Sequence, residues 1–181
     1  MSITLQTSRL QLKTVDRERA ADVLDFIVRN DQFWKIWEPA REAEFYTLEK
    51  QAEILAAESR SIADGSLLKV WLHQNDEMIG SIAISNIVRG VFQSAHVGYK
   101  LAQSHTGKGY MTEALSAVVS YCFDTLELHR LEANIMPRNK ASMNVVKRLG
   151  FYEEGLAIKY LKINGVWEDH LHMVLRNERM E

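Results

Sequence analysis

The spacing of hydrophobic positions along the chain predicts four helices. Apolar residues keep helical spacing from position 111 to 126, which predicts the most regular helix. A shorter helix is predicted over 139–149, where Gly150 suits the position after a helix end. Asp16 and Thr47 are suitable N-caps, so two further helices are expected to begin after them.

Alternating and β-branched stretches predict strands between and around these helices, at 9–13, 68–73, 78–85, 95–101, 130–135, 152–162 and 166–175. The dipeptide Asn164-Gly165 is a strong hairpin signal between the last two. Hairpins therefore lie on both sides of a central strand, helix, strand, helix unit. This order predicts an α/β (α+β) fold with a mixed, largely antiparallel central sheet flanked by helices, formed by a single domain over 1–181.

Composition limits the possible functions. The chain has 181 residues, 46% of them hydrophobic, and a net charge of −2, which argues against a general binder of nucleic acid or membrane surfaces. The single cysteine, Cys122, falls on the apolar side of a predicted helix, so a buried structural thiol is expected. The first fifteen residues lack a signal-peptide core, and we expect a cytoplasmic location.

A glycine-containing loop precedes the most regular helix and comprises Thr106, Gly107, Lys108, Gly109, Tyr110 and Met111. Glycines at a helix entrance allow backbone N–H groups to converge on an anion, and the helix dipole adds favourable potential there. The loop is not a Walker motif, which would require glycine in place of Ala102 and serine or threonine in place of Gly109. It is not a dinucleotide fingerprint either, because that motif requires glycine or alanine where this chain has Thr112. The alternative is that the glycines only make a tight turn.

A second motif begins the helix predicted over 139–149. Asn139 and Ser142 are three residues apart, so their side chains share one helix face and could reach the same ligand. Basic residues surround them, although the chain is slightly acidic overall. Taken alone, this stretch also fits an N-capped helix with a solvated charged face.

Together the two motifs resemble the GNAT acetyltransferase superfamily in order and spacing. The residues at 7–13, 107–114, 128–133 and 149–151 and the closing segment 164–169 are similar to the RimJ/RimL-type branch, many members of which acetylate the N-terminal amine of ribosomal proteins. The resemblance implies acetyl-CoA between two splayed central strands, with Gly98 marking a close backbone approach. The implied coenzyme-binding residues are Tyr99, Leu101, Thr106, Gly107, Lys108, Gly109, Tyr110, Met111, Asn139 and Ser142.

The catalytic groups follow from the same resemblance. Many superfamily members carry a tyrosine that protonates the departing thiolate, but this chain has Val146 at that position, which makes Ser142 or a water bound to it the candidate acid. His96 lies where relatives often carry a glutamate and is a candidate for accepting the amine proton. A histidine satisfied at a sheet edge is the equally good alternative for His96.

The aromatic residues Phe33, Trp34 and Trp37 have helical spacing, which usually indicates core packing. They lie in the insertion that forms the acceptor side of this fold, so contact with the substrate is the second interpretation. His170 and His172 share one side of a strand, but no third ligand is evident, so both are interpreted as structural and no metal is expected.

The expected activity is acetyl transfer from acetyl-CoA to an amine, plausibly the N-terminal amine of a ribosomal protein. The alternatives are acetylation of a small amine, such as an antibiotic, a polyamine or an amino acid, and a coenzyme-binding sensor without catalysis, suggested by Val146 and Ser104. We expect no direct contact with nucleic acid or membrane, and a homodimer is possible.

Overall fold

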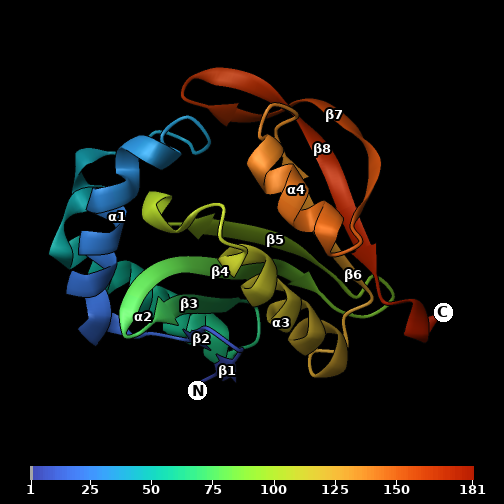
Figure 1. Cartoon of the computed structure of the whole chain (residues 1–181), viewed down its shortest axis with the longest axis horizontal. Helices are drawn as coiled ribbons and strands as arrows, with labels where there is room; N and C mark the ends of the chain where they lie inside the picture. The colour runs from blue at the N-terminus through green and yellow to red at the C-terminus, as the bar shows by residue number, and fades with distance from the viewer. Residues whose placement is uncertain (1) are drawn as a thin grey trace.

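The computed structural model describes residues 2–181, which form eight strands and four α-helices (Figure 1). The strands are β1 (Thr4–Gln6), β2 (Gln11–Lys13), β3 (Leu68–Gln74), β4 (Glu77–Val88), β5 (Ser94–Leu101), β6 (Arg130–Ile135), β7 (Tyr152–Ile163) and β8 (Val166–Arg176). The helices are α1 (Ala20–Trp34), α2 (Leu48–Ala63), α3 (Tyr110–Asp124) and α4 (Lys140–Arg148).

The strands form one sheet in the order β1-β2-β3-β4-β5-β6-β8-β7. Strands β5 and β6 are parallel, whereas the other six neighbouring pairs are antiparallel. A parallel pair needs a crossover connection, and α3 provides it. The prediction of a mixed, largely antiparallel sheet with helices on its faces is therefore confirmed.

Local sequence signals account for most element boundaries. The Thr47 hydroxyl accepts a hydrogen bond from the Lys50 N–H (3.2 Å) at the start of α2, as its N-cap role predicts. Asn164 and Gly165 both have positive φ values (49° and 82°), which is the backbone of the predicted hairpin turn. Strand β1 was not predicted, because its three residues are too few to show an alternating pattern.

The sheet separates two hydrophobic clusters. Helices α3 and α4 pack on one face, where Leu72, Leu115 and Leu131 are fully buried. Helices α1 and α2 pack on the other face around Phe26 and Trp71. Successive residues of a strand point to opposite faces, so each strand contributes side chains to both clusters.

Cys122 lies in the first of these clusters, on α3, and its side chain is buried. Burial raises the pKa of the thiol to about 12, so it stays protonated and unreactive, in agreement with a structural role. None of the helices within residues 2–181 combines the length and apolar character needed to cross a bilayer.

The central feature of the sheet is the early end of pairing between β5 and β6. The two strands pair only from Ser94 with Arg130 to His96 with Glu132, although β5 continues to Leu101 and β6 to Ile135. Beyond the last pair the strands diverge, and the gap opens towards the loop that leads into α3 (Figure 1).

The turn between β1 and β2 is fixed to α3 through Glu113. The Glu113 carboxylate accepts hydrogen bonds from the hydroxyls of Thr7 (2.6 Å) and Ser8 (3.0 Å), and from the backbone N–H (2.8 Å) and guanidinium (2.6 Å) of Arg9. Partial burial opposes ionisation of this carboxyl group, but the four donors outweigh it and lower the pKa to about 2. The first turn of α3 is thereby held against the N-terminal segment.

We predict that Glu113→Gln lowers stability in a pH-dependent way. The folded-state pKa lies below its ordinary value of 4.5, so the ionised carboxylate stabilises the fold fully above that pH, and the contribution is lost as the pH falls towards 2. The expected loss near pH 7 is about 1 to 2 kcal/mol, reduced by the solvent that reaches Arg9. Urea denaturation of both proteins measures it. A difference that persisted unchanged at pH 2.5 would contradict this account of Glu113.

Candidate functional site

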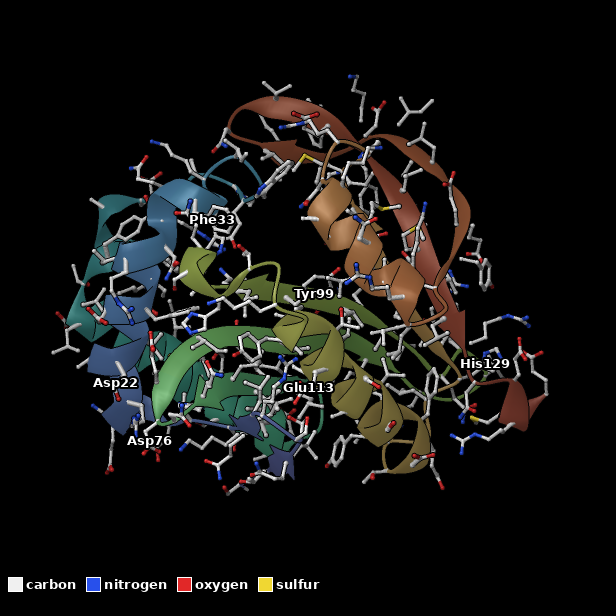
Figure 2. All side chains as sticks on the ribbon, in the orientation of Figure 1. Asp22, Phe33, Asp76, Tyr99, Glu113 and His129 are labelled. Atoms are coloured by element: carbon white, nitrogen blue, oxygen red, sulfur yellow. The ribbon has the colours of Figure 1, made fainter. Side chains whose placement is uncertain are left out.

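A cleft of about 500 Å³ occupies the gap between β5 and β6. Its walls come from the ends of these two strands, the loop before α3, the face of α4, the end of α1 and one residue of β8. In Figure 2, Tyr99 lies at the centre of the sheet beside α3 and α4, and Phe33 lies at the end of α1. Because the gap is in the sheet itself, residues from both faces of the sheet line the cleft.

The glycine loop forms the end of the cleft next to α3. Gly107 and Gly109 have φ values of +74° and +79°, which are left-handed conformations that residues with a side chain rarely adopt. Gly109 is the N-cap of α3 and offers no side-chain hydrogen bond, so within residues 2–181 the N–H groups of the first turn have no side-chain cap. Such groups bind anions, and Arg148 adds a positive charge to the same cleft.

Arg9 holds this loop in place from the N-terminal segment. Its guanidinium donates a hydrogen bond to the backbone carbonyl of Lys108 (3.0 Å) and lies 4.4 Å from the centre of the Tyr110 ring. The Lys108 ammonium donates to the Ser104 carbonyl (2.9 Å), and Lys108 does not line the cleft. Its side chain therefore stabilises the loop, and only its neighbours face the cleft.

Tyr99 and Ser142 meet on the face covered by α3 and α4. The Tyr99 hydroxyl donates to the Ser142 carbonyl (2.9 Å) and also lies 2.7 Å from the Ser142 hydroxyl oxygen, in a contact where either group can be the donor. Burial raises the pKa of Tyr99 to about 12, although the hydrogen bond with Ser142 opposes the shift. Tyr99 is therefore a neutral phenol at physiological pH.

Asn139 is the N-cap of α4. Its side-chain oxygen accepts a hydrogen bond from the backbone N–H of Ser142 (3.2 Å), so the cap does not depend on the Ser142 hydroxyl. Both side chains line the cleft. Among the described residues, Tyr99 is thus the hydrogen-bond partner of the Ser142 hydroxyl, and the Ser142 side chain itself forms part of the cleft wall.

Aromatic residues from the end of α1 line the opposite side of the cleft. Trp34 is buried, donates a hydrogen bond from its indole N–H to the Leu101 carbonyl (2.9 Å), and has the Lys100 ammonium 4.8 Å from its ring centre. Lys100 forms an ion pair with Glu38 (2.6 Å). Phe33 and Trp37 also line this part, so the three aromatic residues combine packing with access to the cleft.

His96 is not brought into the cleft. Its Nδ1 atom is 3.0 Å from the side-chain amide of Asn86, and its Nε2 atom is 3.7 Å from a carboxylate oxygen of Glu132. His96 belongs to the last paired position of β5 and β6, at the closed end of the gap. Its position on the same strand face as Gly98 was foreseen, but the residues that line the cleft begin at Val97.

The structure brings together most of the residues singled out in the sequence. Those that line the cleft are Phe33, Trp34, Trp37, Tyr99, Leu101, Thr106, Gly107, Gly109, Tyr110, Met111, Asn139 and Ser142, whereas Lys108 and His96 lie outside it. Sequence reasoning did not assign Glu38, Asn134, Arg148 or His170 to the cleft wall. Asn134 continues the alternation of polar and apolar residues over 130–135, so the local sequence carried no signal for it.

His170 and His172 do not form a metal site with other residues. Within residues 2–181 there is no group of three or more histidine, cysteine, aspartate or glutamate residues placed to hold an ion. The Tyr160 ring packs against both imidazoles, at centroid distances of 5.7 Å and 5.1 Å. His172 is 2.7 Å from the Glu132 carboxylate, whereas His170 lines the cleft.

Comparison with known proteins identifies the family. The acetyltransferase (GNAT) domain matches residues 9–152. The ribosomal protein uS5-alanine N-acetyltransferase of Escherichia coli strain K12 is 40% identical over 172 residues, covering 93% of this chain and 88% of that protein.

Two solved structures are also similar to this chain. The ribosomal-protein-S5-alanine acetyltransferase of Vibrio fischeri has a TM-score of 0.94 at 31% identity, covering 99% of each chain. RimJ of Mycobacterium smegmatis, in complex with CoA-disulfide, has a TM-score of 0.91 at 29% identity, covering 99% of this chain and 88% of that one. With the cleft between splayed strands, these matches show that the chain belongs to the GNAT acetyltransferase family and is an acetyl-CoA-dependent N-acetyltransferase.

Proposed function

We propose that the acceptor is the N-terminal α-amine of a protein, of the ribosomal-protein alanine or serine type. The observation that carries this proposal is a second hollow of about 360 Å³ beside the cleft, which we call the side hollow. It shares Trp34, Glu38 and Lys100 with the cleft and continues between the end of α1 and the following loop. A peptide could place its first residue in the cleft and the next residues in the side hollow.

The charges of the cleft argue against a polyamine acceptor. Binding of a polycation is favoured by unpaired carboxylates, but Glu38, the carboxylate in the cleft lining, is already paired with Lys100. Arg148 adds a further positive charge. Relatives named as acting on ribosomal protein support the same acceptor class, because they match this chain over nearly its whole length.

The acetyl-CoA site is proposed on the side of α3 and α4. The pyrophosphate would lie on the backbone N–H groups from Thr106 to Met111, and the pantetheine arm along the unpaired edge of β5, between Tyr99 and Asn139. N–H groups of β5 beyond the last pair with β6 could polarise the thioester carbonyl. The acceptor amine would then approach from the side of α1.

Ser142 is the proposed proton donor to the departing sulfur. The single Tyr99 hydroxyl proton can be donated either to the Ser142 carbonyl or to the Ser142 hydroxyl oxygen, and in the second arrangement the Ser142 proton is free to reach the thiolate. Tyr99 remains protonated at physiological pH, because its pKa is about 12, and so it is a steady donor in this pair. A sensor without catalysis would have no need of such a donor, which favours the enzyme.

Four broader expectations stay predictions. The exposed apolar residues Leu156, Ile158 and Leu161 on the edge strand β7 support the possible homodimer. Absence of direct nucleic-acid and membrane contact is consistent with the net charge of −2. A cytoplasmic location and a single domain over 1–181 fit an enzyme that modifies ribosomal proteins.

Acceptor length tests the proposed substrate class. We predict that kcat/KM for a pentapeptide beginning with alanine or serine exceeds that for the corresponding single-residue amide by about tenfold or more, because the side hollow adds binding energy. Spermidine should be a poorer acceptor than either. Thiol release from acetyl-CoA measures all three. Preferred turnover of spermidine or of the single residue would reject a protein N-terminus as acceptor.

The variant Ser142→Ala separates catalysis from helix capping. We predict that kcat falls roughly 10²-fold, within the usual range for loss of one positioned proton donor, and that acetyl-CoA affinity is retained. Thermal stability should change little, because the cap of α4 comes from Asn139 and the backbone of Ser142. Steady-state kinetics, calorimetry and thermal unfolding measure the three quantities. A kcat within about threefold of the original would exclude Ser142 as the acid.

A further inference from the structure

His170 differs from the other histidines on its side of the sheet. It lies on β8, has an exposed fraction of only 3%, and lines the cleft on the face that α1 covers. On the same face, His172 is held by Glu132, and His96 is in contact with Asn86 outside the cleft. Of these three imidazoles, only His170 contributes to the cleft wall.

A hydrogen bond fixes the proton on the His170 ring. The Nδ1 atom is 3.1 Å from the backbone carbonyl oxygen of Glu168, and a carbonyl oxygen only accepts. Nδ1 therefore carries the proton in the neutral ring, and Nε2 keeps its lone pair. This is the tautomer that a proton acceptor needs.

The Nε2 atom of His170 remains available. Among residues 2–181 no group forms a hydrogen bond with it, and it is not sealed in the interior. His73 on β3 provides the contrast, because its Nδ1 bonds to the Trp71 carbonyl in the same way while its Nε2 is buried without a partner. His73 shows the pattern of a structural histidine, whereas His170 lines the cleft and its Nε2 atom is not fully buried.

We propose that His170 is the general base for the acceptor amine, which rests on the proposed amine acetylation. The neutral amine nitrogen attacks the thioester carbonyl carbon, so that an N–C bond forms and the C–S bond breaks. The nitrogen loses one proton to the His170 Nε2 atom, and the sulfur leaves with the electron pair and takes one proton from the Ser142 hydroxyl. Base and acid act from opposite faces of the sheet. To complete the cycle, His170 releases its extra proton to water and the Ser142 oxygen regains a proton from water.

The carboxylates near His170 are already in ion pairs, so His170 is the proton acceptor that remains available. The Glu168 side chain is paired with Arg138 (2.7 Å). Across the cleft, Glu38 is paired with Lys100 (2.6 Å). On β7, Tyr160 packs its ring against the His170 imidazole. On β8, His172 is two residues away and is paired with Glu132.

The experiment compares His170→Asn with His172→Asn. An asparagine amide can replace Nδ1 as donor to the Glu168 carbonyl but supplies no base, so His170→Asn removes the proposed function and keeps the local hydrogen bond. We expect kcat with an alanine-initiated peptide to fall about 100-fold, at unchanged acetyl-CoA affinity and melting temperature. His172→Asn changes a histidine on the same strand face that lies outside the cleft, and its kcat should stay within about threefold.

Chemical rescue adds a readout that a structural role would not affect. Added imidazole should restore turnover to His170→Ala and not to His172→Ala. The proposal is overturned if His170→Asn keeps its kcat within about threefold, or if it loses activity together with stability or acetyl-CoA affinity. Absence of turnover in the unmodified enzyme with this peptide would instead refute the proposed acceptor, so the two failures are distinguishable.

Discussion

The site depends on the short pairing between β5 and β6, which form backbone hydrogen bonds over three residues and then separate. Adjacent strands normally satisfy each other's N–H and C=O groups, so their separation leaves groups along β5 that need another partner. A parallel pair also requires a crossover helix, and α3 fills that role. Because both strands run in the same direction, the start of α3 lies at the wide end of the gap, where the glycine loop faces the cleft.

In the proposed mechanism, the two faces of the sheet on either side of the gap bind different reactants. The face under α3 and α4 carries the anion-binding loop and the Tyr99–Ser142 pair, which suits coenzyme binding and protonation of the leaving sulfur. The face under α1 carries Trp34 and His170, which suits an incoming amine that must lose a proton. The N-terminal segment supports the first of these faces, because Arg9 contacts both the glycine loop and Glu113 of α3.

Much of this arrangement could be predicted from local sequence. Helices and hairpins followed from periodicity, N-caps and the Asn164-Gly165 turn, because these signals act over a few residues. The glycine loop at the end of the cleft could be located for the same reason, since the left-handed conformations at Gly107 and Gly109 favour glycine.

Long-range contacts could not be read in this way. Alternation assigns His96 and Gly98 to one strand face, but it does not reveal that pairing with β6 ends between them, which keeps His96 at the closed end. Likewise, no local pattern distinguishes His170 from His172, because the difference is whether a neighbouring strand end opens onto the cleft. The contacts between Arg9, Lys108 and Glu113 join segments about a hundred positions apart and leave no periodic trace.

Amide hydrogen exchange with and without acetyl-CoA tests most directly whether the divergence of β5 from β6 creates the coenzyme site. Strand β7 is the matched reference, because it is an edge strand far from the glycine loop. Acetyl-CoA should slow exchange in the part of β5 beyond His96 and in the loop 106–111, and leave β7 unchanged. Binding of acetyl-CoA without protection of β5 or of the loop would contradict the account.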